Sequence, residues 1–171
     1  DALPIWIFLF FFSAYLVEKF NFSRTQSADA YVVIAVWTLV ILNTVVKWAS
    51  KLFTTRQLIV ITGVILSISI LVIGLVSNPA IVYWVIPFWT FGASGFYTYF
   101  LSYLSIEAGS EHQGLAMGVA MSLQSVAQIV APILAGLIMS THVSLPLLLS
   151  AFVVMLGACA LFGFFKKTSL H

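Results

Sequence analysis

The sequence predicts an all-α membrane protein, a bundle of six transmembrane helices. Three observations carry this prediction: 62% of the 171 residues are apolar, only 7% are charged, and the charged residues occur in a few short clusters. About fifty consecutive residues between Arg56 and Glu107, and about fifty more between Glu111 and Lys166, contain no Lys, Arg, Asp or Glu. As one helix, each stretch would be about twice as long as a bilayer core is thick, so each must hold two spans and a turn.

Turn residues divide both uncharged stretches. Residues 77–79 (Ser-Asn-Pro) interrupt the first, and residues 140–142 (Ser-Thr-His) interrupt the second; these residue types commonly end helices. Two further apolar runs precede them, and all must be helical because lipid cannot satisfy free backbone groups. We therefore predict a single transmembrane domain over residues 1–171, with spans at 3–19, 30–50, 57–76, 80–104, 113–138 and 146–165.

The composition excludes a soluble domain, in which roughly a quarter of the residues are charged. Soluble binding modules are therefore excluded, and we expect no nucleic-acid partner. We also expect no metal and no cofactor, because three histidines that lie in separate loops or at the chain end cannot converge on one ion: His112, His142 and His171. Cys159 is the single cysteine and lies in the last apolar run, so it has a packing role.

Basic residues predict the orientation in the membrane. An even number of spans places both termini on one side, and the positive-inside rule makes that side cytoplasmic. Two basic residues, Lys19 and Arg24, lie on the other side. Five lie on the side of the termini: Lys47, Lys51, Arg56, Lys166 and Lys167. The chain also begins at Asp1 without a Met, so we expect it to be a piece of a longer protein.

The predicted span at 113–138 carries the most specific pattern. Residues 110–113 match an S-x-x-Q capping box, which predicts a helix start. Gln124 and Gln128 lie one turn apart on one face of this span. In apolar surroundings their side-chain amides need hydrogen bonds from another helix, water or a ligand. A different face carries small residues. The small residues recur at helical spacing and predict a helix-packing face: Gly114, Gly118, Ser122, Ser125, Pro132 and Gly136.

This run of small residues, with Gln113 before it, resembles the eleventh-helix signature of the major facilitator superfamily, in the drug/proton antiporter branch that includes tetracycline exporters. Residues 15–23 are similar to the end of the seventh helix and its outer loop, and residues 92–95 to the glycine pair of the tenth. The resemblance covers essentially the whole chain as the C-terminal six-helix half of a twelve-helix transporter. One departure is the loop at 47–57, which keeps basic residues but lacks the Asp and Gly residues of the family's G-x-x-x-D-x-x-G-R-[KR] motif.

The resemblance implies secondary active transport of a small molecule by alternating access, with no enzymatic activity. It implies an antiporter for efflux in the bacterial cytoplasmic (inner) membrane. The implied partners are the small-molecule substrate, the lipid bilayer, the N-terminal six-helix half and protons. No predicted span has a carboxylate in its interior, so we expect any proton-carrying Asp or Glu in the other half.

Four residues are candidates for the substrate cavity. Asn43 is the most polar residue of the second span, with an interhelical hydrogen bond as the alternative. Tyr97 follows Gly95 in the helix that corresponds to the cavity-lining tenth helix, and Gln124 and Gln128 complete the set. A candidate cytoplasmic gate, for which solvated loop charges are the alternative, consists of Glu107, Glu111, Lys47, Lys51 and Arg56.

Two other classes of protein remain as alternatives. Residues 92–95 also match the G-x-S-G nucleophile motif of rhomboid intramembrane serine proteases. However, His112 lies about 27 Å from Ser94 by helical rise, too far for a Ser–His dyad. A non-catalytic membrane scaffold subunit is the second alternative, since six helices with small-residue faces would serve that role equally well.

Overall fold

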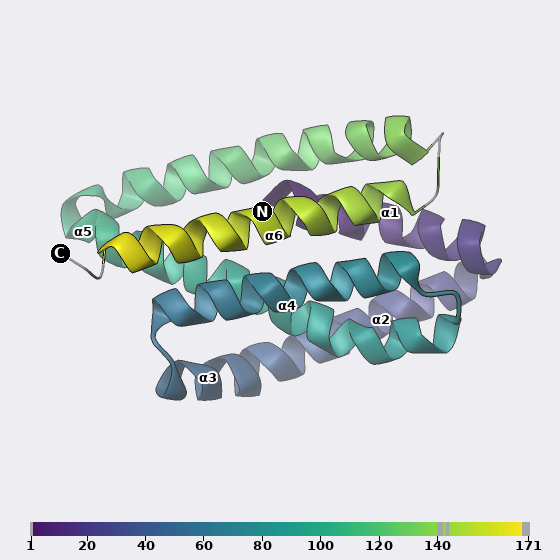
Figure 1. The fold of residues 1–171 in the computed structure, drawn as a ribbon, viewed down its shortest axis with the longest axis horizontal. Coiled ribbons are helices and arrows are strands. Elements are labelled where there is room, and N and C mark those ends of the chain that lie inside the picture. Colours follow the sequence, from purple (N-terminus) through teal and green to yellow (C-terminus); the bar gives the residue numbers. More distant parts are fainter. Residues whose placement is uncertain (1, 140–141, 143, 169–171) are drawn as a thin grey trace.

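The computed structural model describes residues 2–139, 142 and 144–168. The predicted turn residues Ser140 and Thr141, together with Asp1 and His171, lie outside these described residues. Every regular element in the described ranges is helical (Figure 1), which confirms the all-α class. The elements are α1 (Ala2–Phe20), α2 (Arg24–Val40), the π-helix η1 (Ile41–Val45), α3 (Val46–Leu52), α4 (Thr55–Leu75), α5 (Pro79–Met139) and α6 (Leu145–Thr168).

Local hydrogen bonds explain where two of these helices begin. Ser23 precedes α2 and forms a reciprocal capping box with Gln26, and Thr54 forms the same motif with Gln57 before α4. Each box satisfies two backbone amides that a helix start leaves free. Between α1 and α2 the chain turns through Asn21, whose φ of 54° is a left-handed conformation that asparagine tolerates better than most residues.

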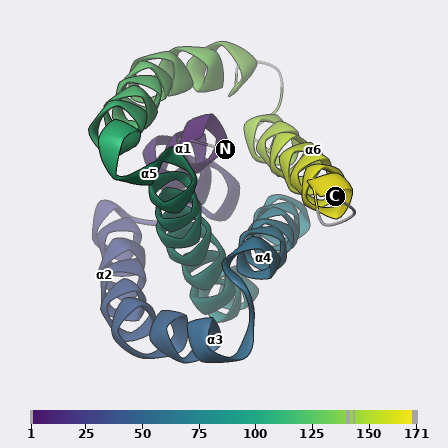
Figure 2. The same ribbon diagram turned by 90° about the vertical axis from the view of Figure 1, so that its left-hand side faces the viewer.

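Helix α5 consists of two helical limbs, residues 79–108 and 110–139, that meet at Gly109. Gly109 has φ 67° and ψ 171°, a backbone conformation that glycine adopts without steric cost. Figures 1 and 2 show the chain reversing at this point, so that the second limb returns along the bundle. The sequence predicts a capping box from Ser110 to Gln113 here. In the structure, the Gln113 amide donates instead to the hydroxyl of Ser105 on the first limb.

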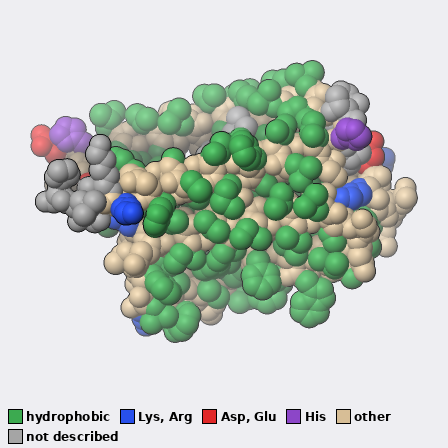
Figure 3. Space-filling model, viewed as in Figure 1, with side chains coloured by type: hydrophobic (Ala, Val, Ile, Leu, Met, Phe, Trp, Pro, Cys, Tyr) green, Lys and Arg blue, Asp and Glu red, His purple; other side chains and the backbone are tan. Residues whose placement is uncertain are grey.

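Within the part of the chain that the structure describes, four helical segments are long and apolar enough to cross a membrane: Arg24–Leu52, Thr55–Leu75, Pro79–Ile138 and Leu145–Lys166. Figure 3 shows charged and histidine side chains toward the two ends of the molecule, with many hydrophobic side chains spread over the face between them. Many large hydrophobic side chains of the described residues are exposed to the surroundings of the bundle, such as Trp84 at 78%. An apolar surface of this extent suits a lipid environment, while the count of six spans stays a prediction.

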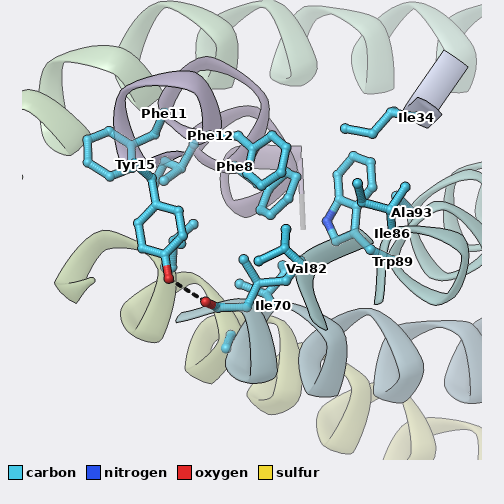
Figure 4. Close-up of a cluster of buried hydrophobic side chains, with 14 of the residues drawn as sticks. Phe8, Phe11, Phe12, Tyr15, Ile34, Ile70, Val82, Ile86, Trp89 and Ala93 are labelled. Atoms are coloured by element: carbon cyan, nitrogen blue, oxygen red, sulfur yellow. Dashed lines mark hydrogen bonds between the residues drawn. The ribbon is translucent and has the colours of Figure 1, made fainter. Parts of the chain in front are cut away.

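The main core lies among α1, α4, α6 and the first limb of α5. Figure 4 shows Phe8 and Phe12 of α1 directed toward Trp89 of α5, and the rings of Phe8 and Trp89 stack with centroids 4.3 Å apart. Tyr15 is fully buried and its hydroxyl donates to the carbonyl of Ile73. A buried tyrosine needs such a partner, so this bond fixes α1 against the end of α4.

Helix α4 has ten buried residues and packs mainly on α5 and α6. Glycines allow the close approach of α5. A Cβ atom on Gly92 would lie 2.7 Å from the backbone nitrogen and Cα of Leu66, and one on Gly95 would lie 2.8 Å from Cγ2 of Thr62. The hydroxyl of Ser67 donates to the carbonyl of Ala151 at 2.7 Å and joins α4 to α6.

Lys19 ties three helices together at the end of the bundle where α4 terminates. Its Nζ donates to the carbonyl of Gly74 at 2.8 Å, to the hydroxyl of Tyr15 at 2.8 Å and to the hydroxyl of Ser144 at 3.4 Å. The carbonyl of Gly74 is one of those that the last turn of α4 leaves without an intrahelical partner, and a cation is favourable at that end of a helix.

Candidate functional site

A hollow in the described structure lies between α1, α2 and the two limbs of α5. Its volume is about 880 Å³. Trp6 of α1 and Ile34 of α2 contribute to one side of it, Trp89 and Tyr97 line it from the first limb of α5, and Gln124 lines it from the second. In the end-on view of Figure 2 the first limb of α5 lies near the centre of the molecule, with the second limb at the periphery. The volume is within the range of small-molecule sites.

Tyr97 and Gln124 connect the two limbs of α5 across this cavity. The hydroxyl of Tyr97 donates to Oε1 of Gln124 at 3.2 Å. The sequence predicts both residues for a substrate cavity, and the structure brings their side chains together in one. Among the described residues, Nε2 of Gln124 donates no hydrogen bond, so the amide keeps both donors for a molecule in the cavity.

The remaining lining of the cavity is mainly apolar and aromatic. Thr38 also lines it, but its hydroxyl donates to the carbonyl of Ile34 on its own helix at 2.7 Å. Ser94 and His112 add two further polar side chains. None of the lining residues is a Lys, Arg, Asp or Glu. Five are aromatic: Trp6, Trp89, Phe96, Tyr97 and Phe100.

The structure places the other two predicted cavity residues outside this lining. Asn43 lies in η1, exposed on the surface of the bundle, and its Nδ2 donates to the carbonyl of Leu39 on the same helix at 2.8 Å. Gln128 is half-buried one turn beyond Gln124 and does not line the cavity. The interhelical hydrogen bond considered for Asn43 is not made by its amide nitrogen, which bonds within its own helix.

The second limb of α5 packs on the core through a different set of small residues from the one that the sequence pattern indicates. Ala127, Ala131 and Ala135 are buried at intervals of one turn. The predicted packing residues are open: no described atom outside their own helix lies within 4 Å of a Cβ built on Gly114, Gly118 or Gly136. Ser122 and Pro132 are also exposed, so any helix that packs on this face lies outside the described chain.

Two of the predicted gate residues form an ion pair. Nη2 of Arg56 at the start of α4 lies 3.2 Å from Oε1 of Glu107 at the end of the first limb of α5. The guanidinium of Arg56 also lies over the rings of Tyr103 and Phe165, 5.6 and 5.7 Å from their centroids. This cluster joins α4, α5 and α6. Glu111, Lys47 and Lys51 are exposed and do not belong to it.

Ser94 and His112 both line the cavity, which bears on the serine protease alternative. The first limb is helical from residue 79 to 108, so about 21 Å of helical rise separates Ser94 from its end. Ser94 and His112 therefore line different parts of the cavity, which does not favour a Ser–His dyad. Among the groups of His, Cys, Asp and Glu that the structure describes, none could hold a metal ion.

Sequence reasoning missed most of the aromatic lining. Trp89, Phe96 and Phe100 face the cavity from one side of the first limb, together with Ala93 and Leu104. Their spacing of three, four and seven residues is helical and was visible in the sequence. An aromatic stripe of this kind is equally typical of a packing face, so the pattern alone does not indicate a cavity.

Long apolar helices, charges confined to the ends and a cavity among the helices define an integral membrane protein. The family model of the Major Facilitator Superfamily matches residues 1–169. The chain therefore belongs to the Major Facilitator Superfamily, whose members transport small molecules across membranes. Membership in a family of transporters is consistent with a protein that is not an enzyme. No curated protein matches the chain closely enough to count as a relative.

Proposed function

We propose that this protein carries out secondary active transport by alternating access, and that this chain forms one half of the central cavity. The observation that carries the proposal is the cavity of about 880 Å³ between α1, α2 and both limbs of α5, which holds the Tyr97–Gln124 hydrogen bond. Transporters of this superfamily bind substrate near the bilayer midplane between two six-helix halves. A half that contributes one wall of such a site needs an inward-facing hollow of this kind.

Counting α1, the continuous run of α2, η1 and α3, then α4, the two limbs of α5 and α6 gives six proposed spans. The other six-helix half would face the cavity and the open small-residue face of the second α5 limb. The proposal includes efflux by proton antiport in a bacterial inner membrane, with both termini in the cytoplasm, as for the exporter branch that the sequence resembles. The Arg56–Glu107 pair would then lie at the cytoplasmic end of the bundle.

Cysteine accessibility tests alternating access directly. Single cysteines replace Tyr97 or Gln124 in the full-length protein in which Cys159 is Ser, and a membrane-impermeant thiol reagent is added from one side of the membrane at a time. A thiolate forms readily only where water reaches the sulfur. We expect labelling at both positions from either side, because the cavity opens alternately to the two sides.

The control is Phe152→Cys in α6. Its side chain is 63% exposed on the apolar surface and does not line the cavity, so we expect no labelling from either side. Labelling of Tyr97→Cys and Gln124→Cys from a single side would contradict alternating access. Silence at both would contradict a water-filled cavity. Cysteines at Asn43 and Gln128 test the two candidates that lie outside the cavity lining.

A further inference from the structure

We infer that the substrate held by this cavity wall is an uncharged aromatic compound with a hydrogen-bond acceptor, such as a ketone. The inference rests on the proposed function, since it assigns a substrate class to the same cavity. Three properties of the wall carry it: the absence of Lys, Arg, Asp and Glu from its lining, its aromatic side chains, and the unused donors of the Gln124 amide.

The lack of charged lining residues disfavours a charged ligand. An ion that leaves water for an apolar site loses solvation free energy that only a counter-charge or several hydrogen bonds can offset. This wall supplies no carboxylate, ammonium or guanidinium group among its lining residues. The single ionisable imidazole, His112, lies twelve residues before Gln124 on the same limb, about 18 Å away along the helix. A small ligand at Gln124 does not reach it.

Aromatic rings give the wall its preference for flat ligands. Trp6 and Phe100 are only partly buried and Tyr97 is 43% exposed, so these three rings have surface left to contact a ligand. Phe96 is buried and stacks on Phe100 with ring centroids 6.0 Å apart. Aromatic pairs prefer offset-stacked or edge-to-face contacts that add to simple area burial. A flat aromatic ligand therefore gains more from this wall than a saturated ligand of equal size.

The Tyr97–Gln124 pair provides the polar specificity. Because Oε1 of Gln124 already accepts the Tyr97 hydroxyl proton, the group that the amide offers to the cavity is its NH₂. A carbonyl oxygen on the ligand fits this donor, and a ligand without an acceptor leaves it unpaired in apolar surroundings. Tyr97 acts as a positioning residue because it orients the amide.

A matched set of four naphthalenes tests the inference by equilibrium binding to the full-length protein in lipid nanodiscs. The probes are 2-acetylnaphthalene, 2-ethylnaphthalene, 2-naphthoate and (2-naphthylmethyl)trimethylammonium, and empty nanodiscs correct for partition into lipid. We expect saturable binding of the ketone, binding of the ethyl compound weaker by about 3- to 10-fold, and binding of both ions weaker by at least about tenfold.

Variants locate the binding determinant. Gln124→Leu is expected to abolish the preference for the ketone over the ethyl compound while the ethyl compound still binds. Tyr97→Phe, which keeps the ring, is expected to reduce that preference, and Trp6→Leu to weaken both neutral probes by a similar factor. The control is Gln113→Leu, which removes an amide from the same limb outside the cavity lining and should leave the preference unchanged.

Tighter binding of either ion than of the ketone would overturn the inferred substrate class, and so would a ketone preference that persists in both Gln124→Leu and Tyr97→Phe. Absence of saturable binding by all four probes would overturn it as well. The cysteine-labelling experiment is independent of these probes. If labelling occurs from both sides and none of the naphthalenes binds, the transport proposal stands and the substrate class is wrong.

Discussion

The absence of a Cβ atom at Gly92 allows α5 to approach α4 closely. The missing side chain of Gly92 leaves room for the backbone of Leu66, which would lie 2.7 Å from a Cβ atom. Contacts this short do not persist, and backbone atoms have less freedom to move aside than the end of a flexible side chain. Gly92 therefore sets the distance between two helices that bear much of the core.

We expect Gly92→Ala to destabilise the protein by about 1 to 3 kcal/mol, because the added methyl group overpacks the contact between α4 and α5. Thermal unfolding in detergent measures the change. Gly163→Ala in α6 is the matched control, since no described atom outside its own helix lies within 4 Å of its Cβ position. It should be neutral or slightly stabilising, because alanine favours the helix. Equal stability of the two variants would show that α5 can move away from α4 at little cost.

At single positions, the sequence identified the polar residues within apolar spans but did not predict which of their side chains point into the cavity. Tyr97 and Gln124 stood out as polar groups in apolar spans, and they line the cavity. Gln128 and Asn43 stood out for the same reason and lie elsewhere. The difference depends on helix rotation, which the contacts of buried residues such as Ala127 and Ala131 determine. One sequence without a partner half does not fix that rotation.

Among the elements, the two limbs of α5 depend on one backbone conformation. Gly109 has a positive φ, and no described atom lies within 4 Å of its Cβ position. A substitution at this position therefore acts through the backbone and not through a clash. The reversal of the chain at Gly109 places Gln124 opposite Tyr97, so the geometry of the cavity depends on it.

Replacing Gly109 with Ala is expected to cost about 1 to 3 kcal/mol, because a residue with a Cβ atom is strained at a positive φ combined with an extended ψ. Gly109→Asn should cost about as much, because φ 67° with ψ 171° lies outside the left-handed helical region that asparagine tolerates and is adopted almost only by glycine. The distance between spin labels at Leu101 and Leu115, measured in both variants, reports whether the limbs stay side by side. If the alanine variant is as stable as the wild type with an unchanged distance, the chain does not need a glycine there.

The helices themselves were largely predictable, because the charge-free stretches and turn residues mark them. The predicted spans at 57–76 and 146–165 lie close to α4 (Thr55–Leu75) and α6 (Leu145–Thr168). The helix that contains the predicted span at 30–50 begins at Arg24, six residues before that span, because the Ser23 capping box starts α2 there. Its π-helix was not foreseen, since a wide turn has no clear signature in local composition. The small-residue face stays a prediction for contact with another helix.

At the scale of the whole molecule, the proposal is that this chain supplies one wall of a transport cavity and a second half supplies the other. We expect residues 1–171 alone, reconstituted into liposomes, to show no saturable proton-coupled flux of the ketone probe or of cationic aromatic compounds. Alternating access requires two halves that move around one site. The full-length protein in parallel liposomes is the control. Saturable flux from the isolated chain would refute the half-transporter proposal.

The packing of α4 on α5 and α6 has a consequence for the order in which the protein assembles during synthesis. Its main neighbours, α5 and α6, follow it in the chain, so α4 enters the bilayer before the helices that cover it exist. Thr62 and Ser69 donate to carbonyls of α4 itself, Leu58 and Ile65, and so are already satisfied in the lone helix. The hydroxyl of Ser67 has its acceptor, the carbonyl of Ala151, only after another 84 residues have been synthesised. Helix α4 can therefore lie in lipid at little cost, and its hydrogen bond from Ser67 forms when α6 packs against it.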